Sequence, residues 1–562
     1  MKFTSQKSAL PILFLLICSC PVFVTAQSLF VQQGTKHLPF FERLGIILQQ
    51  HPDLNIYTPS SIPRALAVQV AGLEDSSSGN PSVKLSRVDQ QHLLSFLRNN
   101  AEYANWDLRR KPILYRNWAN FFEISNENFY LNLNPVGIAQ QSYETGNKDP
   151  VYHMAGGASL RGLIGKKFGF YTYFTKHAES APVFLRKRIE HFNAVPGIGY
   201  FETYKNRRGF VYYDARGGVN FNGSKHFNAE IAFDRNFIGN GYRSLILSDY
   251  GYNYLYFKSN IYIWKFRYEH LYAKLADPFS TGSSREKWPY GEKVMYMHHL
   301  SINTTKWLTL SLFQSIIANE EIKWHYFNPI MFFPRTGYQK THPANKEIAG
   351  FEFKANVAKR VQLYGQFLSD HFHLKQVFSG DNWWNNRFGI QLGAKYIDVF
   401  SIKNLDVQVE MNSVRPYTYS SGDSIGSYSH YNQPLAHPFG ANFREWIGIL
   451  RFQPNKRITL YTRLIYWNQG FDTSRAENFG SEILKPFSSR PYDYGVETGN
   501  GYKGSGVNAQ FQFSYEIAEN VFFDALVLLR KINLENDLIP KDNITLLSAG
   551  IRMNIFRRDY DF

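Results

Sequence analysis

The sequence predicts an all-β transmembrane barrel of antiparallel strands, about eighteen in number, with a small α-helical region before it. Three observations predict this class. Aromatic residues make up 17% of the 562 residues, although the mean hydropathy is only -0.35. Long segments alternate apolar and polar residues, and short turns alternate with long polar segments. A barrel shows lipid only every second side chain, whereas a bundle of membrane-spanning helices would be far more apolar.

The first residues have the pattern of a secretory signal peptide. Lys2 and Lys7 form a basic start, residues 9–20 are apolar, and Val-Thr-Ala at 24–26 offers small residues for cleavage. We expect residues 1–26 to be removed. Two alternatives stay open. One is a membrane anchor, although the apolar run is shorter than the roughly 20 residues that a spanning helix needs. The other is a lipoprotein signal with Cys20 as the lipidated residue.

Cysteine content and charge narrow the chemistry. Cys18 and Cys20 are the only cysteines, so the mature chain would hold no disulfide, thiolate metal site or cysteine nucleophile. The formal net charge is +16, and it would be +14 without Lys2 and Lys7. Export argues against nucleic acid as a partner. Acidic polysaccharide, lipopolysaccharide phosphates or anionic solutes fit a basic exported protein better. A basic surface that serves only solubility is the alternative.

Residues 27–111 are predicted to form a small periplasmic region of about three short helices. Five apolar residues recur at helical spacing, namely Leu38, Phe41, Leu44, Ile47 and Leu48. Ser61 followed by Pro63 is a helix start, and residues 89–97 form a further amphipathic stretch. We expect this region to plug the periplasmic mouth of the barrel.

Residues 112–562 are predicted to form the barrel, because the apolar period changes from the helical to the two-residue repeat near Phe129. In residues 405–412, for example, Leu, Val and Met alternate with Asp, Gln, Glu and Asn. The apolar face of another such strand is predicted to comprise Tyr262, Trp264, Phe266 and Tyr268. Many runs reach about ten residues, the length that crosses a bilayer at a tilt.

About eighteen strand starts follow from this pattern. They lie near Phe129, Val151, Phe168, Phe210, Phe227, Tyr252, Ile261, Val294, Lys306, Lys346, Arg360, Arg387, Leu405, Phe443, Arg457, Gly504, Asn520 and Asn543. Tight turns are predicted at 165–167, 222–225, 304–305, 358–359, 403–404, 454–456 and 518–519, and long polar segments at 176–209, 318–345, 415–442 and 468–503. All these turns fall at one end of the barrel, as do the short periplasmic turns of outer-membrane barrels. A hairpin within residues 189–208 is an alternative.

The sequence leaves open where the last strand ends and which register it has. The last strand is predicted to present the apolar face Thr545, Leu547, Ala549, Ile551, Met553 and Ile555. The terminus Tyr560-Asp561-Phe562 is typical of many outer-membrane barrels, but Phe562 is out of phase with this face. Either a bulge shifts the register, or the strand stops near Phe556 and a short tail follows.

No strong catalytic or metal-binding pattern is present, and we predict a protein that is not an enzyme and needs no cofactor or metal. The nearest candidate for catalysis is Asp370 beside His371, with His373 close by in the sequence. Charged residues at inward positions should line the lumen, because an Arg or Lys facing mid-bilayer lipid costs about 2–4 kcal/mol. They are Lys265, Arg267, Glu269, Lys354, Lys395, Asp406, Glu410, Arg463 and Arg552. They form either a mutually paired network or a pore or ligand path.

Two segments, residues 234–245 and 428–442, break the strand pattern with glycines, amides, arginines, histidines and tyrosines. Aromatic rings that stack on sugars, together with amide and guanidinium donors, are what a polysaccharide contact needs. The predicted glycan-binding residues are Arg235, Asn236, Asn240, Tyr242, Arg243, Tyr431, Asn432, His437 and Asn442. The alternative is a rigid loop structure folded into the lumen.

These segments carry a family resemblance. The runs NFIGNGYRSLILSD (residues 236–249) and HYNQPLAHPFGANF (residues 430–443) resemble those of Bacteroidetes outer-membrane proteins grouped with the Wzi capsule-assembly family, some of which are labelled gliding-motility protein RemB. The resemblance covers essentially the whole mature chain. It implies an eighteen-stranded barrel with a periplasmic helical bundle. It also implies a non-enzymatic role in holding capsular polysaccharide or exopolysaccharide at the cell surface. No ligand-binding motif carries over from the family.

Three functions are therefore considered for a protein of the cell outer membrane. The first is a barrel that binds or organises surface polysaccharide, with outer-membrane lipid and acidic polysaccharide or lipopolysaccharide as partners. The second is an accessory barrel of the gliding-motility or secretion machinery. The third is a porin for anionic solutes. The composition of the chain fits all three.

Overall fold

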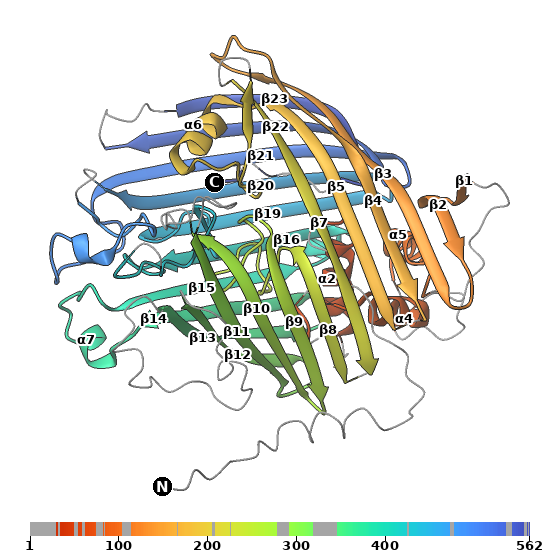
Figure 1. Ribbon diagram of the computed structural model, residues 1–562, viewed down its shortest axis with the longest axis horizontal. Coiled ribbons are helices and arrows are strands. Elements are labelled where there is room, and N and C mark those ends of the chain that lie inside the picture. Colours follow the sequence, from red (N-terminus) through yellow and green to blue (C-terminus); the bar gives the residue numbers. More distant parts are fainter. Residues whose placement is uncertain are drawn as a thin grey trace, which may run out of the picture.

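Eighteen antiparallel strands close into a transmembrane barrel (Figure 1). In this computed structural model they are β3 (Phe129–Glu144), β4 (Val151–Ile164), β5 (Phe168–Ser180), β7 (Gly209–Ser224), β8 (Phe227–Asp234), β9 (Tyr254–Ile263), β10 (Phe266–Asp277), β11 (Gly291–Asn303), β12 (Leu308–Ala318), β13 (Lys346–Val357), β14 (Val361–His371), β15 (Arg387–Tyr396), β16 (Leu405–Val414), β19 (Phe443–Asn455), β20 (Ile458–Phe471), β21 (Tyr502–Ala518), β22 (Val521–Leu534) and β23 (Asp542–Met553). The ring closes where β23 pairs with β3, from Leu546 opposite Glu144 to Met553 opposite Gly137. The predicted fold class is confirmed.

The structure describes residues 30–31, 34–49, 54, 56–58, 62–74, 83, 85–103, 114–165, 167–204, 208–224, 226–277, 291–318, 346–423, 426–472, 477–535, 542–555, 559 and 561–562. The predicted signal peptide, residues 1–26, lies outside these residues. Within them, no helix is both long and apolar enough to cross a membrane.

The two faces of the barrel wall differ as the alternation predicts. On β20, the side chain of Arg463 is 1% exposed and points into the lumen, while the next residue, Leu464, is 49% exposed on the outside. An arginine that faces lipid at mid-bilayer depth would destabilise the barrel by about 2–4 kcal/mol. A charged side chain at this depth is therefore expected to face the lumen. The outer face is correspondingly apolar and the inner face polar.

Successive strands are joined alternately by short turns and long loops, which define a turn end and a loop end of the barrel. One turn differs from the prediction. Residues Trp264 and Lys265 form a hairpin turn between β9 and β10, with Ile263 opposite Phe266. A strand start at Ile261 is therefore wrong, and Lys265 is exposed at the turn instead of lining the lumen. Tyr262 faces inward and packs against the hydrophobic cluster of the N-terminal helices. The predicted lipid-facing side was wrong because consecutive apolar residues before Trp264 hide the change of phase at the turn.

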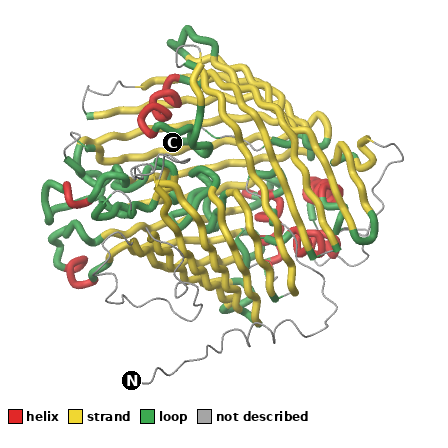
Figure 2. The backbone as a smooth tube through the Cα atoms, in the orientation of Figure 1, coloured by secondary structure: helices red, strands yellow, loops and turns green. Residues whose placement is uncertain are grey.

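The described residues contain five α-helices, and three of them precede the barrel: α2 (Leu38–Leu48), α4 (Arg64–Glu74) and α5 (Arg87–Asn99). The hydroxyl of Ser86 caps α5 by accepting the N–H of Asp89 at 3.0 Å. Figure 2 shows these helices in red against the turn end of the strands. They are held to the wall by ion pairs, such as Lys36 with Glu516 at 2.6 Å and Glu42 with Lys395 at 3.0 Å.

Small elements complete the fold. A hairpin of β1 (Leu114–Asn117) and β2 (Asn120–Ser125) extends the sheet beside β3, and β6 (Glu202–Tyr204) pairs with β7. The loop between β5 and β7 thus holds α6 (Val183–Phe192) and one short strand where a hairpin was an alternative. α7 (Leu374–Phe378) lies in the loop between β14 and β15.

A short tail follows the last strand, which ends at Met553 and pairs with its neighbours without a bulge. The second alternative for the terminus is therefore the observed one. Asp561 and Phe562 are buried inside the barrel. The guanidinium of Arg188 lies 4.4 Å from the centre of the Phe562 ring. The terminal aromatic residue packs against loops in the lumen, which explains why it is out of phase with the lipid-facing side.

Candidate functional site in the barrel lumen

Two loops fold into the loop-end half of the lumen, and we refer to the described residues of 235–253 and 415–442 as the lumen plug. Hydroxyl groups join the two segments: Tyr419 donates to the Leu245 carbonyl at 2.7 Å and Tyr428 to the Ile246 carbonyl at 2.9 Å. Leu245 and Ile246 are completely buried in a hydrophobic core shared with Leu271 of the wall. The two segments therefore form a packed loop structure inside the lumen.

Arg243 is the central polar residue of the plug. Its guanidinium donates to Asp561 at 2.8 Å and to Glu445 of β19 at 3.1 Å, and its backbone N–H donates to Glu410 of β16 at 3.1 Å. Burial disfavours its charge, but Asp561 and Glu445 outweigh that cost and raise the pKa of Arg243. The neighbouring Tyr242 donates its hydroxyl to Asp561 at 2.5 Å. The side chains of Tyr242 and Arg243 therefore both form hydrogen bonds within the protein.

His437 and Asn442 hold the end of the plug. The Nε2 atom of His437 lies 2.7 Å from a carboxylate oxygen of Glu445. The amide of Asn442 donates to the carbonyls of Gly470, Phe479 and Asn500 at 2.8–3.1 Å. It also accepts the N–H of Gly499 at 2.7 Å. Asn442 therefore fastens the plug to the loop between β20 and β21, and no donor of its amide is left for a ligand.

Tyr431 and Asn432 form a tight turn. They connect β17 (Ser429–His430) to β18 (Gln433–Pro434), and both have positive φ, 50° and 61°. This combination is typical of a two-residue hairpin turn, in which asparagine is favoured. The Tyr431 ring packs on Tyr252 at 5.6 Å. Asn240 is also buried, and its side-chain oxygen accepts no hydrogen bond within the described part of the chain.

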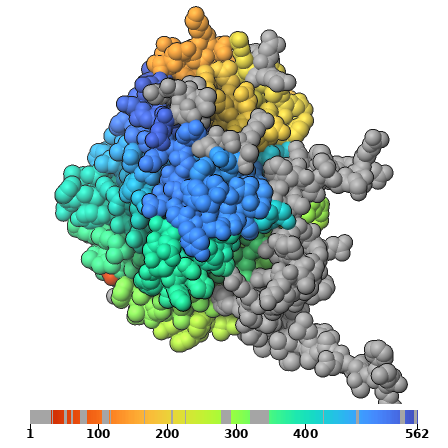
Figure 3. All heavy atoms as spheres, turned by 90° about the vertical axis from the view of Figure 1, so that its left-hand side faces the viewer, coloured from red at the N-terminus to blue at the C-terminus, as the bar shows by residue number. Residues whose placement is uncertain are grey.

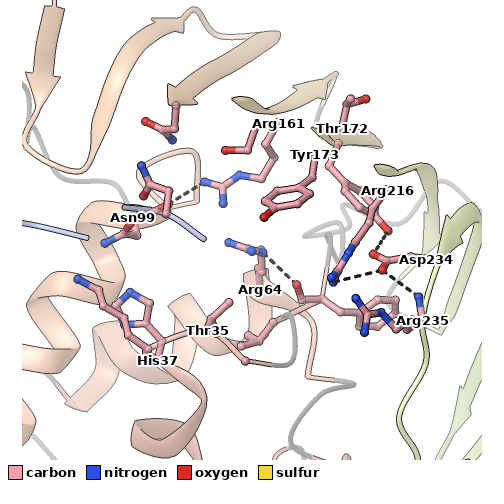
Figure 4. Close-up of a pocket in the computed structure, with 18 of the residues that line it drawn as sticks. Thr35, His37, Arg64, Asn99, Arg161, Thr172, Tyr173, Arg216, Asp234 and Arg235 are labelled. Carbon is pink, nitrogen blue, oxygen red and sulfur yellow. Dashed lines mark hydrogen bonds and ion pairs between the residues drawn. The ribbon is translucent and has the colours of Figure 1, made fainter. Parts of the chain in front are cut away.

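A polar cavity of about 330 Å³ lies between the N-terminal helices, the wall and the lumen plug (Figure 4). Of the nine predicted residues, Arg235 and Asn236 line it. The other seven are absent from its lining. Its size is within the roughly 300–1,000 Å³ of ordinary small-ligand pockets. A smaller cavity of about 130 Å³ shares Tyr173 and Arg235 with it and reaches Gly197 in the loop between β5 and β7.

Five arginine side chains line the described part of the cavity, among them Arg552 of β23. Figure 4 labels the other four: those of Arg64, Arg161, Arg216 and Arg235. They come from a helix, from β4, from β7 and from the lumen plug. Arg161 pairs with Glu102 at 3.0 Å and Arg216 with Asp214 at 2.7 Å.

The other two guanidinium groups are less well compensated. Arg64 donates to the carbonyl of Phe30 at 3.0 Å and to the side-chain oxygen of Asn100 at 2.7 Å. Burial, reinforced by nearby Arg161, lowers the pKa of Arg64 to about 9. Burial and Arg216 likewise lower the pKa of Arg235. Seven Lys and Arg side chains line the described part of the cavity, against four Asp and Glu side chains: Glu230, Asp234, Asp249 and Glu269. The lining therefore carries an excess of positive charge, which an anionic group would reduce.

Neutral groups of the cavity suit a sugar. Asn120, Asn132 and Asn134 place amides on the β2–β3 side of the cavity. The ring of Tyr173 lies between Arg161 and Arg216 in Figure 4. Sequence reasoning missed Arg64, Arg161, Arg216 and Tyr173. The strand phase of Arg161, Tyr173 and Arg216 indicates an inward side chain, but phase alone does not show that they meet at one cavity.

Asp370, the candidate for catalysis, is bonded to neighbouring residues of the protein. The carboxylate of Asp370 pairs with Lys346 and, at 3.4 Å, with Arg387, and it accepts the N–H of Tyr419 at 3.0 Å. Among the described residues, no group of three or more His, Cys, Asp or Glu side chains is arranged to hold a metal ion.

Comparisons with known proteins find a similar fold among solved structures. No family model matches the sequence, and neither does any curated protein. A solved structure aligns over 94% of this chain and 100% of its own, with a TM-score of 0.53 and 13% identity. It is Wzi of Escherichia coli, described as an outer membrane protein involved in group 1 capsule assembly and as a carbohydrate-binding β-barrel. The fold is similar to that of Wzi.

The Wzi alignment takes in more of the chain than the barrel strands alone. Two further solved structures have lower TM-scores. OprD of Pseudomonas aeruginosa aligns with a TM-score of 0.40 at 11% identity, over 75% of this chain and 94% of its own. OccAB3 of Acinetobacter baumannii aligns with a TM-score of 0.40 at 10% identity, over 76% of this chain and 98% of its own. At these identities, the likeness to Wzi concerns the fold.

Proposed function

We propose that this protein is a non-enzymatic barrel of the outer membrane that binds or organises capsular polysaccharide or exopolysaccharide at the cell surface. The observation that carries the proposal is the cavity ringed by Arg64, Arg161, Arg216 and Arg235, with asparagine amides and the Tyr173 ring beside them. The similarity in fold to Wzi, a carbohydrate-binding barrel, supports it. In this proposal the turn end faces the periplasm and the loop end faces outward, as in other outer-membrane barrels.

The proposed ligand is an acidic polysaccharide, and lipopolysaccharide is the alternative anionic partner. A carboxylate between Arg64 and Arg161 would receive charge-assisted hydrogen bonds from both side chains. It would relieve the cost of burying two guanidinium groups close together. Arg235 and Asn236 remain proposed ligand contacts. We propose that Asn240, Tyr242, Arg243, Tyr431, Asn432, His437 and Asn442 act indirectly, by holding the lumen plug in place.

The packed lumen favours this function over a diffusion porin. The lumen plug shares a hydrophobic core with the wall, and the tail residues Asp561 and Phe562 lie in the same space. Figure 3 looks onto the loop end, where loop residues cover the centre of the face. We propose that the helices also plug the periplasmic mouth. Planar-bilayer recordings should show little ionic current, and stable porin-like conductance would contradict the plugged barrel.

Oligosaccharide binding tests the proposal directly. Purified protein in nanodiscs would be titrated with tetragalacturonate as the acidic probe and with maltotetraose as the neutral one. Arg64→Gln and Arg161→Gln should each weaken binding of the acidic probe about 10–100-fold, as loss of one charge-assisted hydrogen bond of about 1.5–3 kcal/mol requires. Arg208→Gln removes an exposed arginine outside the cavity and is the matched control. Equal affinity in all four proteins would reject the cavity as the site.

The cellular role has its own test. Deletion of the gene should shift polysaccharide from the cell-bound to the shed fraction, and unchanged attachment in a capsulated strain would count against the proposal. From the runs at residues 236–249 and 430–443, we further propose that the chain belongs to the Bacteroidetes branch of the Wzi family, which includes proteins labelled RemB. Recovery of motility or secretion components with the tagged protein would favour the accessory function instead.

A further inference from the structure

The helix α7 exposes an apolar stripe outside the barrel. Leu374, Val377 and Phe378 are 60%, 37% and 81% exposed, and no residue of this helix is buried. Their spacing places all three on one side of the helical turn, with Lys375 and Gln376 away from them. Figure 1 shows α7 at the edge of the molecule, beyond the loop ends of β14 and β15. Exposed apolar residues grouped in this way mark a contact surface.

The stripe adjoins the lipid-facing wall. Phe351 of β13, Phe367 of β14 and Phe388 of β15 lie on neighbouring strands. The ring centre of Phe367 lies 5.4 Å from that of Phe351 and 6.1 Å from that of Phe388. Phe372, two residues before α7, packs its ring on Phe367 at 5.6 Å and on Phe388 at 5.5 Å. The aromatic surface of the barrel therefore leads directly to the base of α7.

We propose that α7 lies in the membrane interface and buries its apolar stripe in the lipid leaflet at the loop end of the barrel. Continuity with the lipid-facing rings of Phe367 and Phe372 selects lipid as the occupant. A short amphipathic segment gains free energy by placing its apolar side at the boundary between headgroups and acyl chains. Lys375 can extend its ammonium group toward lipid phosphates while its methylene groups stay near the apolar layer.

Site-specific lipid contact tests this proposal. In a full-length chain with Cys18→Ser and Cys20→Ser, single cysteines would be introduced as Phe378→Cys, Lys375→Cys and Tyr494→Cys and labelled with the fluorophore NBD. Lys375→Cys probes the other side of the same helical turn. Tyr494→Cys probes an exposed aromatic position in the loop between β20 and β21. The proteins would be reconstituted into phosphatidylcholine vesicles with or without bromine on the acyl chains.

Brominated lipid should quench the label at position 378 at least twofold more than the labels at positions 375 and 494. The label at 378 should also emit at shorter wavelength than the other two. Equal quenching at all three positions would overturn the proposal. A shielded label at 378 that brominated lipid does not quench, but that cross-links to another copy, would assign the stripe to protein association and likewise overturn it.

Discussion

A guanidinium nitrogen of Arg243 lies 2.8 Å from a carboxylate oxygen of Asp561, a residue 318 positions further along the chain. A second nitrogen of the same guanidinium donates to the backbone carbonyl of Asp561 at 2.6 Å. Through these bonds the lumen plug and the C-terminal tail form one buried unit. Arg243 therefore organises the interior of the barrel, although its type and setting in the sequence suggested a ligand contact.

Replacing Arg243 should loosen this unit. Arg243→Met leaves the carboxylates of Asp561 and Glu445 buried without this partner, and loss of one member of a buried ion pair costs about 3–5 kcal/mol. The free energy of urea-induced unfolding should fall by that amount, and current fluctuations should rise in planar bilayers. Arg208→Gln, at an exposed position, should change stability by less than about 0.5 kcal/mol. Equal stability of both variants would show that the pair does not hold the plug.

Acidification should destabilise the lumen plug through His430. Its Nδ1 accepts the N–H of Ala276 at 2.9 Å and its Nε2 donates to the carbonyl of Asn253 at 3.1 Å, so the bonds require the neutral ring. Burial lowers its pKa to about 4. The unfolded value is about 6.5, so the unfolded state binds more protons between these pH values. Stability is full above about pH 6.5 and falls as pH drops toward 4.

Hydrogen exchange of the plug measures this effect. Residues 426–442 should exchange faster as pH falls from about 6.5 to 4, after correction for the intrinsic pH dependence of exchange. His430→Gln removes the titrating group, so its residual pH dependence in this window should be smaller. A pH profile identical to that of the unchanged protein would assign the destabilisation to other groups.

Asn442 should control the loop between β20 and β21. Its φ is 60°, a conformation that glycine adopts freely, so Asn442→Gly keeps the backbone and removes the four hydrogen bonds of the side chain. We expect faster proteolysis within residues 477–501 while the barrel stays folded. Asn442→Ala adds backbone strain and should be cleaved faster still. Resistance of both variants would mean that other contacts hold this loop.

The phase of β20 can be tested with a charge. Leu464→Arg places a guanidinium on the lipid-facing side, where it should cost about 2–4 kcal/mol if the position lies near mid-bilayer. Urea-induced unfolding in lipid vesicles would measure this change. Thr462→Leu alters the same outer face without charge and serves as the control. A tolerated arginine at 464 would contradict the assigned phase.

Local patterns were sufficient to predict most of the barrel. The two-residue repeat and the turn residues located the strands of residues 129–553, because a strand must alternate between lipid and lumen wherever it crosses the membrane. The prediction failed at Tyr262 and Lys265, where aromatic and aliphatic residues follow one another through a two-residue turn. The terminus was ambiguous for a related reason, since a tail that re-enters the lumen is as aromatic as a strand.

The candidate site depended on tertiary structure. Sequence pattern shows that Arg161 and Arg216 point inward, but it contains no information on which neighbours they meet, because those neighbours come from distant strands, helices and loops. A polar segment folded into a charged lumen has the same composition as one exposed to water. The sequence by itself determined the class, the strand order and, except around Tyr262 and Lys265, the side of the wall that strand residues face. Only the tertiary structure decided that Arg243 binds Asp561 and that Arg64 and Arg161 share a cavity, since charge pairing depends on distance in space and not along the chain.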